Sequence, residues 1–274
     1  MTKICDNPNL QSLITEAISL EEIDSFFRLF NFNIGLDFNL RELSKKAMGV
    51  ATIADRFNDK FSEYGWIATE DMSVPLMEQA VKLFEENGLE EAENFICASF
   101  DEAYFSLHSS RMRAIWVWSE GRSRLLELAF IDHKQGRYHA SVPVVLAQID
   151  GLSFDSNKES FFDKKIALII KNSIAAHESG LHSLSNIVSQ PRAKTHSDPL
   201  NIPYRHGILH GRELAYDNKL VSTKCFFILF ALRPWALKCQ QVEFDRQSGK
   251  KNEQIAGFKA GDLLAEKVKE ILKG

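Results

Sequence analysis

The chain has few cysteines, no long uninterrupted apolar run and no excess of positive charge. None of its apolar segments approaches the roughly 18 residues that a membrane-spanning helix needs, and its first residues lack the apolar region of a signal peptide. Its four cysteines are scattered without the Cys-x-x-Cys spacing of a zinc ribbon, as is typical of proteins in a reducing cytosol. We therefore expect a cytoplasmic protein that does not contact a membrane.

Several common sequence motifs of enzymes are absent as well. There is no P-loop, no Gly-x-Gly-x-x-Gly and no Gly-x-Ser-x-Gly, so nucleotide binding or serine hydrolysis of those types is not expected. The segment from His177 to His182 resembles the zinc-binding His-Glu-x-x-His motif only superficially, because its histidines are five residues apart and do not share a helix face. We expect neither a metal nor a cofactor.

The charged residues are nearly balanced, with 33 Lys and Arg against 37 Asp and Glu and a formal net charge of −4. This balance excludes the general basic coat of a DNA-coating protein, although it is compatible with a local basic pocket for RNA. With 45% apolar residues in a chain of 274, there is enough material for a sizeable hydrophobic core.

Apolar residues recur with helical spacing along the whole chain, and no strand-like alternation rises above that pattern. The predicted fold class is therefore all-α. The helix at 214–238 is expected to be buried, and Arg233-Pro234 to end or kink it. The expected helices cover approximately residues 9–32, 40–64, 73–100 (a pair divided at Asn87-Gly88), 109–135, 138–152, a stretch from Phe161 onward, 214–238 and 264–272.

The helical pattern suggests three regions along the chain. Residues 1–104 form a helical accessory region without chemistry of its own, in which Trp66 is expected to be a buried packing residue. The acidic stretch at residues 85–93 is most simply a solvated face. Residues 105–245 form a helical bundle, and residues 246–274 form a C-terminal tail with an amphipathic helix.

Residues 202–212 gather two of the eight histidines, two of the fourteen glycines and two arginines. Proline suits the first turn of a helix, so Pro203 is expected to open a helix that carries Arg205, His206 and His210 on its first two turns. Basic side chains beside the positive end of a helix dipole make sense where an anion binds. A phosphate is the obvious candidate.

Gly207 and Gly211 lie four residues apart in the same stretch. A glycine in a helix interior costs roughly 1 kcal/mol relative to alanine, and close approach of another backbone or of a ligand is the usual reason for accepting that cost. We expect the motif helices of two copies to meet at these glycines. The alternative interpretation is a helix start with two surface histidines and no site.

Arginine and histidine without a metal form a set that suits RNA cleavage. A histidine with a pKa near neutrality can take the proton from a ribose 2′-hydroxyl or protonate the leaving oxygen. An arginine can hold the phosphate and stabilise the charge that develops on it. Because the 2′-hydroxyl is an internal nucleophile, the protein need not supply a nucleophile or a metal.

Residues 205–211 (Arg-His-Gly-Ile-Leu-His-Gly) resemble the Arg-(four to six residues)-His signature of the HEPN superfamily, the higher eukaryote and prokaryote nucleotide-binding domains. Residues 133–151 resemble the turn and second helix of prokaryotic members of the same group. The resemblance covers about residues 105–242, so it identifies residues 105–245 as an HEPN-like helical bundle.

The resemblance implies a metal-independent endoribonuclease of the kind found in toxin and phage-defence systems, with a composite site where two copies of a homodimer meet. Carried over to this chain, Arg205 and His210 match the signature and His206 matches its polar position. The expected partners are RNA and, in such a system, an antitoxin or another defence component. Further residues considered for substrate binding or orientation are Tyr204, Arg212, Tyr216, Arg137 and Asp150.

Two other interpretations remain open. In the first, the chain is a non-catalytic HEPN bundle that binds RNA, a nucleotide or a protein partner, which the acidic net charge would also suit. In the second, the helical N-terminal part is a scaffold, and deletion of residues 1–100 would remove partner binding but leave the remainder folded.

Overall fold

The chain is all-α in the computed structural model, which describes residues 3–29, 40–163, 166–170 and 173–248. Within these ranges there is no strand, and the only extended pairing is an isolated bridge between His196 and Glu213. The α-helices are α1 (Pro8–Leu29), α2 (Leu40–Phe61), α3 (Val74–Asn87), α4 (Leu89–Ser99), α5 (Glu102–Met112), α6 (Glu120–Lys134), α7 (Tyr138–Asn157), α8 (Ser183–Val188), α9 (Arg205–Leu209), α10 (Lys219–Ala231) and α11 (Arg233–Gln247). Short 3-10 turns lie at Ile4–Asp6 and Ser62–Tyr64, and a π-helical turn lies at Glu178–His182.

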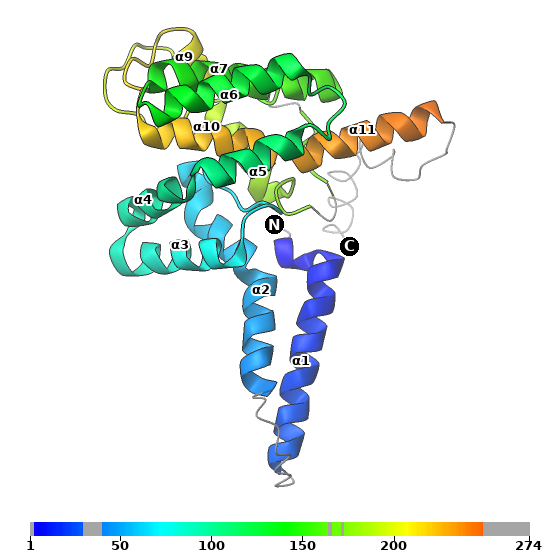
Figure 1. The fold of residues 1–274 in the computed structure, drawn as a ribbon. Helices are drawn as coiled ribbons and strands as arrows, with labels where there is room; N and C mark the ends of the chain where they lie inside the picture. Colours follow the sequence, from blue (N-terminus) through cyan, green and yellow to red (C-terminus); the bar gives the residue numbers. More distant parts are fainter. Residues whose placement is uncertain (1–2, 30–39, 164–165, 171–172, 249–274) are drawn as a thin grey trace, which may run out of the picture.

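The helices are arranged as a body with a projecting hairpin (Figure 1). Helices α1 and α2 run antiparallel and extend away from the body, whereas α3 and α4 lie where the hairpin joins it. The remaining long helices form the upper layer, and α9 lies at the end of the molecule opposite the tip of the hairpin. This arrangement places the Arg-His motif far from the hairpin.

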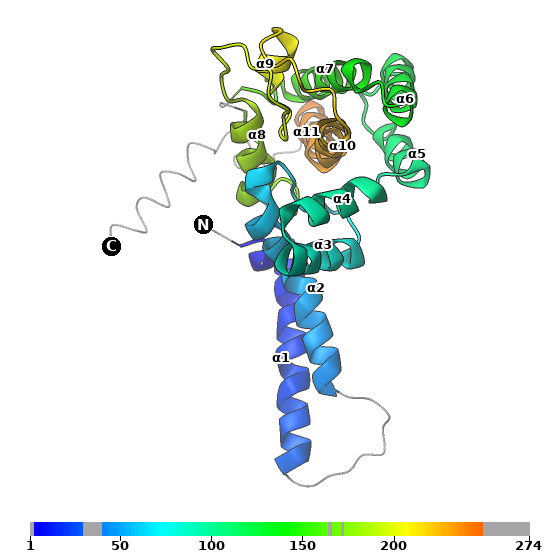
Figure 2. The same ribbon diagram turned by 90° about the vertical axis from the view of Figure 1, so that its left-hand side faces the viewer.

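Helix α10 is the centre of the body. Figure 2 views it nearly end-on, with α4, α5 and α7 around it and α11 continuing behind it. Every residue from Val221 to Ala231 is buried, and the run from Cys225 to Ala231 is entirely apolar. Phenylalanine rings fill the space around it, including a stacked pair, Phe105 and Phe130, whose ring centroids are 3.9 Å apart. The prediction of a buried helix in this part of the chain is confirmed.

The stretch Lys219–Gln247, which α10 and α11 share, is long and apolar enough to cross a membrane by length and composition alone. Its mean hydropathy is 1.4, and 78% of its most apolar window is buried inside the fold. The expectation that no apolar segment approaches the length of a membrane span was therefore wrong for this stretch. A core helix that is mostly buried inside a fold passes the same test of length and composition.

Local sequence signals explain most helix boundaries. Gly88 has φ +89° and separates α3 from α4, as Asn87-Gly88 predicts. Ser73, Ser119 and Asn218 each accept a hydrogen bond from the backbone of the following first turn. Arg233-Pro234 divides α10 from α11, which confirms the expected break.

Three expected helices differ from the structure. The helix at 109–135 is two helices, α5 and α6, since the chain turns through residues 113–119 before Ser119 starts a new one. The helix from Phe161 onward is absent: the described residues up to 176 form turns and irregular backbone, in which the Ile170 amide donates to the carbonyl of Ala176. The helix at 214–238 begins later, at Lys219. The expectations for residues 30–39 and 249–274 lie outside the described residues.

A buried ion pair joins the N-terminal region to the bundle. The Lys224 ammonium lies 2.6 Å from Glu93 Oε1, and the indole N–H of Trp66 donates to the same oxygen at 2.9 Å. Lys224 is completely buried, and burial lowers its pKa, against the opposing effect of Glu93. The prediction of a buried Trp66 is confirmed, whereas the solvated face expected for residues 85–93 is wrong at Glu93.

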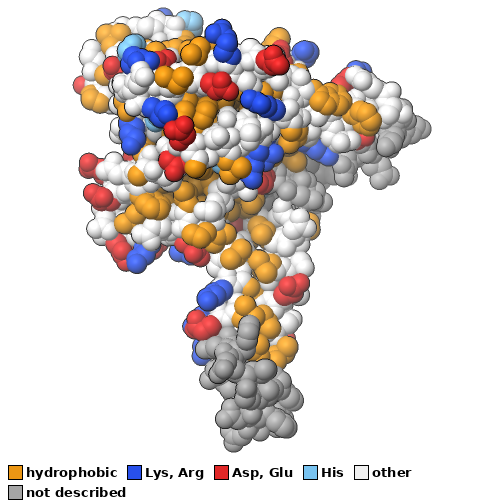
Figure 3. Space-filling model, viewed as in Figure 1, with side chains coloured by type: hydrophobic (Ala, Val, Ile, Leu, Met, Phe, Trp, Pro, Cys, Tyr) orange, Lys and Arg blue, Asp and Glu red, His pale blue; other side chains and the backbone are white. Residues whose placement is uncertain are grey.

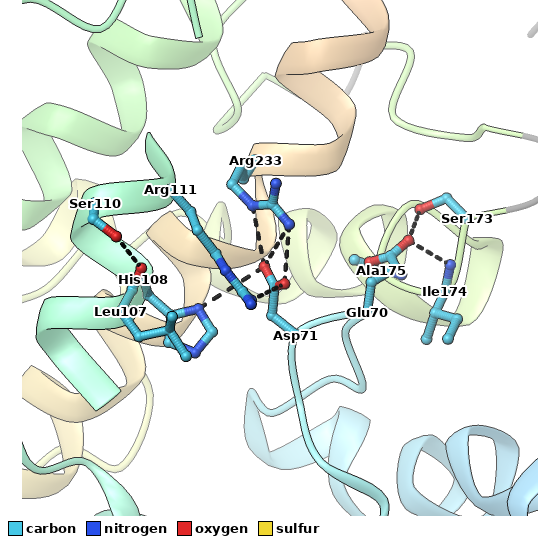
Figure 4. A network of polar contacts seen from close by, with 10 residues as sticks. All are labelled: Glu70, Asp71, Leu107, His108, Ser110, Arg111, Ser173, Ile174, Ala175 and Arg233. Atoms are coloured by element: carbon cyan, nitrogen blue, oxygen red, sulfur yellow. Dashed lines mark hydrogen bonds and ion pairs between the residues drawn. The ribbon is translucent and has the colours of Figure 1, made fainter. Parts of the chain in front are cut away.

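A second polar cluster connects the loop after Trp66 with the bundle (Figure 4). Asp71 accepts hydrogen bonds from Arg233 Nη2 at 2.8 Å and from Arg111 Nη1 at 2.6 Å. The neighbouring Glu70 accepts from Ser173 Oγ and from the backbone amide of Ile174. These contacts cross the predicted boundary at residue 104, as does the hydrophobic core, which runs continuously from Ile4 to Cys239.

Candidate functional site

The Arg-His motif lies on α9, a short helix that packs against α7. The helix begins at Arg205 with Tyr204 at its N-cap, so Pro203 precedes it and does not open it. It ends at Leu209, which makes His210 the C-cap, and the following Gly211 has φ +67°. The expected two turns are thus little more than one, and a glycine in the left-handed region ends the helix.

Arg205 is anchored to α7. Its Nη2 donates to Asp150 Oδ2 at 2.8 Å, and its guanidinium carbon lies 5.6 Å from the ring centre of Phe162. The hydroxyl of Ser160 donates to the other carboxylate oxygen of Asp150. About a quarter of each charged side chain stays exposed, 23% for Arg205 and 26% for Asp150, so the pair is open to a ligand. The orienting role considered for Asp150 is compatible with this geometry.

The two histidines of the motif lie next to each other. The imidazole rings of His206 and His210 are 5.9 Å apart between centroids and nearly parallel, at 15°. His206 is half-buried and His210 is exposed. Burial lowers the pKa of His206, the nearby charges of Arg205 and His210 lower it further, and Asp150 opposes them. His206 therefore favours its neutral form, which can accept a proton.

The motif glycines have separate roles within one chain. A Cβ on Gly207 would lie 2.3 Å from Glu213 Cγ and 3.1 Å from Arg192 Cγ, so the close approach expected there is to side chains of the same chain. A Cβ on Gly211 would meet nothing within 4 Å, and its positive φ alone accounts for a glycine. The glycines thus have intrachain explanations and give no separate support for a meeting of two motif helices.

Two residues outside the predicted site, Arg192 and Glu213, pack against Gly207 of α9. Glu213 is completely buried and forms an ion pair with Arg192. The guanidinium of Arg192 in turn lies over the Tyr204 ring, 4.2 Å from its centre. Glu213 Oε2 is buried with no hydrogen-bond partner among the described residues. Arg192 belongs to the polar loop before the motif, but no signal in the sequence pairs it with Glu213.

Three of the other candidate residues, Arg212, Tyr216 and Arg137, form hydrogen bonds to backbone carbonyls or to a nearby carboxylate. Arg212 Nη1 donates to the carbonyl of Arg192 at 2.9 Å, which fixes the loop that precedes the motif. Tyr216 donates to the carbonyl of His139 at 3.2 Å. Because His139 and Asp150 are eleven residues apart on α7, that contact is about 16 Å along the helix from the Arg205 pair.

Arg137 lies just before α7 begins, at the same end as His139. Its Nε donates to Asp132 Oδ1 at 2.8 Å, and it also contacts Gln135, so it stabilises the turn between α6 and α7. The structure therefore brings together Arg205, His206, His210 and Asp150, with Tyr204 beside them, and it leaves Arg137 and Tyr216 at the other end of α7.

Across the part of the chain that the structure describes, no group of three or more His, Cys, Asp or Glu side chains is arranged to hold a metal ion. His182, at the end of the π-helical turn, and His177 accordingly belong to no such group.

No family model, curated protein or solved structure that was compared with the chain matches it. The likeness to the HEPN superfamily therefore rests on residues 133–151 and 205–211 of the sequence.

Proposed function

We propose that the chain is a metal-independent endoribonuclease of the HEPN type. The observation that carries the proposal is the joint position of three side chains: Arg205, held 2.8 Å from Asp150, lies next to a pair of nearly parallel imidazoles on an open surface. A cation, a general base and a general acid are what the cleavage of a phosphodiester next to a 2′-hydroxyl requires, and imidazoles can serve as both base and acid.

In the proposed reaction, the ribose 2′-oxygen attacks the adjacent phosphorus and the bond to the 5′-oxygen breaks. His206 accepts the proton of the 2′-hydroxyl, because its lowered pKa keeps it neutral. His210 donates a proton to the leaving 5′-oxygen. Arg205 binds a phosphate oxygen and stabilises the added negative charge. The products are a 2′,3′-cyclic phosphate and a 5′-hydroxyl end.

Asp150 is a positioning residue in this scheme. Its contact with one terminal nitrogen fixes the guanidinium and leaves the other terminal nitrogen to face a phosphate. Tyr204 contributes one ring face to substrate binding at most, because Arg192 occupies the other. The expected base stacking is therefore restricted to a single side of this ring.

Incubation of the purified protein with total RNA in the presence of EDTA tests the proposal. We expect cleavage with chelator present and cyclic phosphate ends on the products. An RNA with a 2′-deoxy residue at a mapped cleavage site should resist cutting there, because it lacks the nucleophile. Cleavage that needs an added divalent metal, or that leaves 5′-phosphate ends, would contradict the mechanism.

Variants at the site test the assignment of residues. Arg205→Ala, His206→Ala and His210→Ala should each lower the cleavage rate by about 100-fold or more, which is the usual effect of losing a general acid, base or charge-stabilising group. His139→Ala is the matched control, since that histidine is exposed on α7 away from the Arg205 pair and should leave the rate unchanged. RNA binding without cleavage in the unmodified protein would favour the non-catalytic alternative.

A role in a toxin or phage-defence system in the cytoplasm, with a neutralising or regulatory partner, is part of the same proposal. It predicts that expression of the intact chain arrests cell growth and degrades RNA, and that the His210→Ala variant does neither. If the unmodified protein and the His210→Ala variant arrest growth equally, the toxicity does not depend on this site.

A further inference from the structure

Arg192 carries a guanidinium to which the proposed reaction assigns no role. Its Nε donates to Glu213 Oε1, and its guanidinium carbon lies 4.2 Å from the centre of the Tyr204 ring. Among the described residues, neither of its terminal nitrogens forms a hydrogen bond, and 27% of the side chain is exposed. The two terminal nitrogens form the fork with which arginine binds phosphate oxygens, so this fork is free for a ligand.

Glu213 keeps the Arg192 guanidinium in one position. The glutamate is completely buried, and its second carboxylate oxygen has no hydrogen-bond partner in the described ranges. Arg192 is the only cation that pairs with it there. Movement of Arg192 away from Glu213 would leave a buried charge without its partner, which is strongly unfavourable. The fork is thus pre-organised, because the fold itself fixes the arginine before any ligand binds.

The side chain of Arg192 runs along α9. Its Cγ lies 3.1 Å from the position of a Cβ on Gly207, and its guanidinium lies over Tyr204, so it extends from the middle of the helix to the start. Arg205 follows Tyr204 directly and is held by Asp150. The two guanidinium groups therefore lie at the same end of α9, and a carboxylate fixes each of them.

This part of the surface is basic in a chain whose net charge is −4. Residues 192–212 contain four Lys and Arg and a single acidic residue, Asp198, together with three histidines. Pale-blue histidine side chains, with blue basic side chains beside them, are visible at the end of the molecule where α9 lies (Figure 3). Arg212, which donates to the carbonyl of Arg192, adds a third arginine to this surface. Such a local excess of positive charge suits a polyanion.

We propose that Arg192 binds a second phosphate of the RNA strand, next to the phosphate that Arg205 binds. Phosphates follow one another along an RNA backbone, so a strand cut at the Arg205 site always presents another one nearby. The terminal nitrogens of Arg192 bind two oxygens of that phosphate, and the unoccupied face of Tyr204 remains for a base. This inference rests on the proposed ribonuclease function for its ligand, and it defines the substrate as a strand with at least two phosphates.

A purely structural role for Arg192 predicts a different result. If Arg192 only neutralises Glu213, a lysine in its place serves equally well, because its ammonium can pair with the same carboxylate. A lysine has no fork, however, so an ammonium that contacts Glu213 leaves no second group to bind a phosphate. The Arg192→Lys variant therefore separates the two roles while the buried carboxylate keeps a cation.

Binding of an uncleavable RNA is the first measurement. A fluorescent 2′-O-methyl oligonucleotide cannot be cut, because its 2′-oxygens are blocked, and its anisotropy reports binding at several salt concentrations. Arg192→Lys should raise the dissociation constant by about 10-fold or more, the usual effect of losing hydrogen bonds to a charged group. It should also reduce the slope of log affinity against log salt by about 0.7, the share of one phosphate contact on a single strand.

Arg41→Lys is the matched control for this measurement. Arg41 is exposed in the first turn of α2, and α2 begins at the end of the hairpin that points away from the body and from α9 (Figure 1). The control variant should change neither the dissociation constant nor the salt slope. Circular dichroism should show the same helicity for both variants and the unmodified protein.

Substrate length is the second measurement. A dinucleoside monophosphate contains only the phosphate that is cut, so Arg192→Lys should leave its kcat/KM unchanged. On a longer RNA the same variant should lower kcat/KM by about 10-fold or more, mainly through KM, because the second phosphate is bound equally in the ground state and in the transition state. Arg205→Ala should lose activity on both substrates.

The two measurements distinguish this inference from the proposed function. RNA binding that depends on Arg192 in a protein that does not cleave RNA would support the second phosphate contact and reject the ribonuclease mechanism. Cleavage with unchanged binding and KM in Arg192→Lys overturns the inference and leaves the mechanism intact. Equal losses on the dinucleotide and on longer RNA also overturn it, since Arg192 would then act through the fold, and so does an unmodified protein that binds no RNA.

Discussion

The terminal guanidinium nitrogen of Arg205 lies 2.8 Å from a carboxylate oxygen of Asp150, which ties α9 to the middle of α7. This contact joins residues 55 positions apart in the sequence. It also places a negative charge close to His206 and raises the pKa of that imidazole, whereas burial, Arg205 and His210 lower it. Asp150 thus influences both the position of the arginine and the protonation of the histidine.

Replacement of Asp150 by Asn should lower the cleavage rate by about 10- to 100-fold, because Arg205 loses its charged anchor. It should also move the acidic limb of the pH–rate profile to lower pH, since the removal of an anion lowers the pKa of His206 further. The measurement is the rate of RNA cleavage between pH 4 and 8. An unchanged profile together with a reduced rate would assign Asp150 a purely structural role.

Gly207→Ala should lower the free energy of unfolding by about 1–3 kcal/mol, because the new methyl group would overlap Glu213 and crowd Arg192. Urea denaturation followed by circular dichroism measures this change. Gly121→Ala in α6 is the matched control, since its nearest neighbour would be Ser119 Oγ at an ordinary 3.7 Å. Equal stability of the two variants would contradict the close packing described for Gly207.

Lys224→Met should destabilise the fold by about 3–5 kcal/mol, because it leaves the buried Glu93 carboxylate without its cation. Glu93→Leu should have a similar effect by leaving the buried ammonium unpaired. The double variant Lys224→Met with Glu93→Leu should be less destabilised than the sum of the two single replacements at those positions, as a double-mutant cycle in urea would show. Strict additivity would mean that the two groups act independently.

Acidification should weaken the fold through two buried histidines. Burial lowers the pKa of both His108 and His133 to about 4. At His108 the carboxylate of Asp71 raises the pKa in opposition to burial, whereas Arg111 and Arg233 lower it further. At His133 the ammonium of Lys219 also lowers the pKa. Above pH 6.5 neither state of the protein binds these protons. As the pH falls from 6.5 toward 4, only the unfolded state binds them, so stability is lost by up to about 3 kcal/mol for each histidine.

The test of this pH dependence is urea denaturation at several pH values between 7 and 4. His108→Gln and His133→Gln should each flatten the slope over that interval, whatever their effect on stability at pH 7. The exposed His139→Gln is the control and should keep the slope of the unmodified protein. A slope that neither buried replacement alters would mean that other groups cause acid destabilisation.

The sequence was sufficient to predict the fold class and much of the core, because helical periodicity and glycine or proline breaks are local signals. The division of α3 from α4 at Gly88 and of α10 from α11 at Pro234 follows from such signals. The stretch after Phe161 shows their limit. Its apolar spacing suits a helix, but Phe161, Phe162 and Ile166 are buried in irregular backbone whose polar groups bond to other parts of the chain, such as the Phe161 amide to Ser153.

The candidate site was predictable only in part. Arg205, His206 and His210 are close in sequence, so their proximity in space follows from a single turn of helix. Asp150 was one of several candidates, and only the packing of α9 on α7 distinguishes it from Arg137. Glu93 was interpreted as solvated because its neighbours are acidic, since a local charge pattern contains no information about a lysine 131 positions away.

The contact between Lys224 and Glu93 has a consequence for synthesis of the chain. Glu93 and Trp66 leave the ribosome well before Lys224, so until then the carboxylate has no ammonium to neutralise it and favours contact with water. The same ammonium donates to the carbonyl of Asn201, immediately before the motif segment. Closure of the first helices over α10 therefore has to wait until translation has passed the Arg-His motif, so the chain can complete its core only after the motif segment has been made.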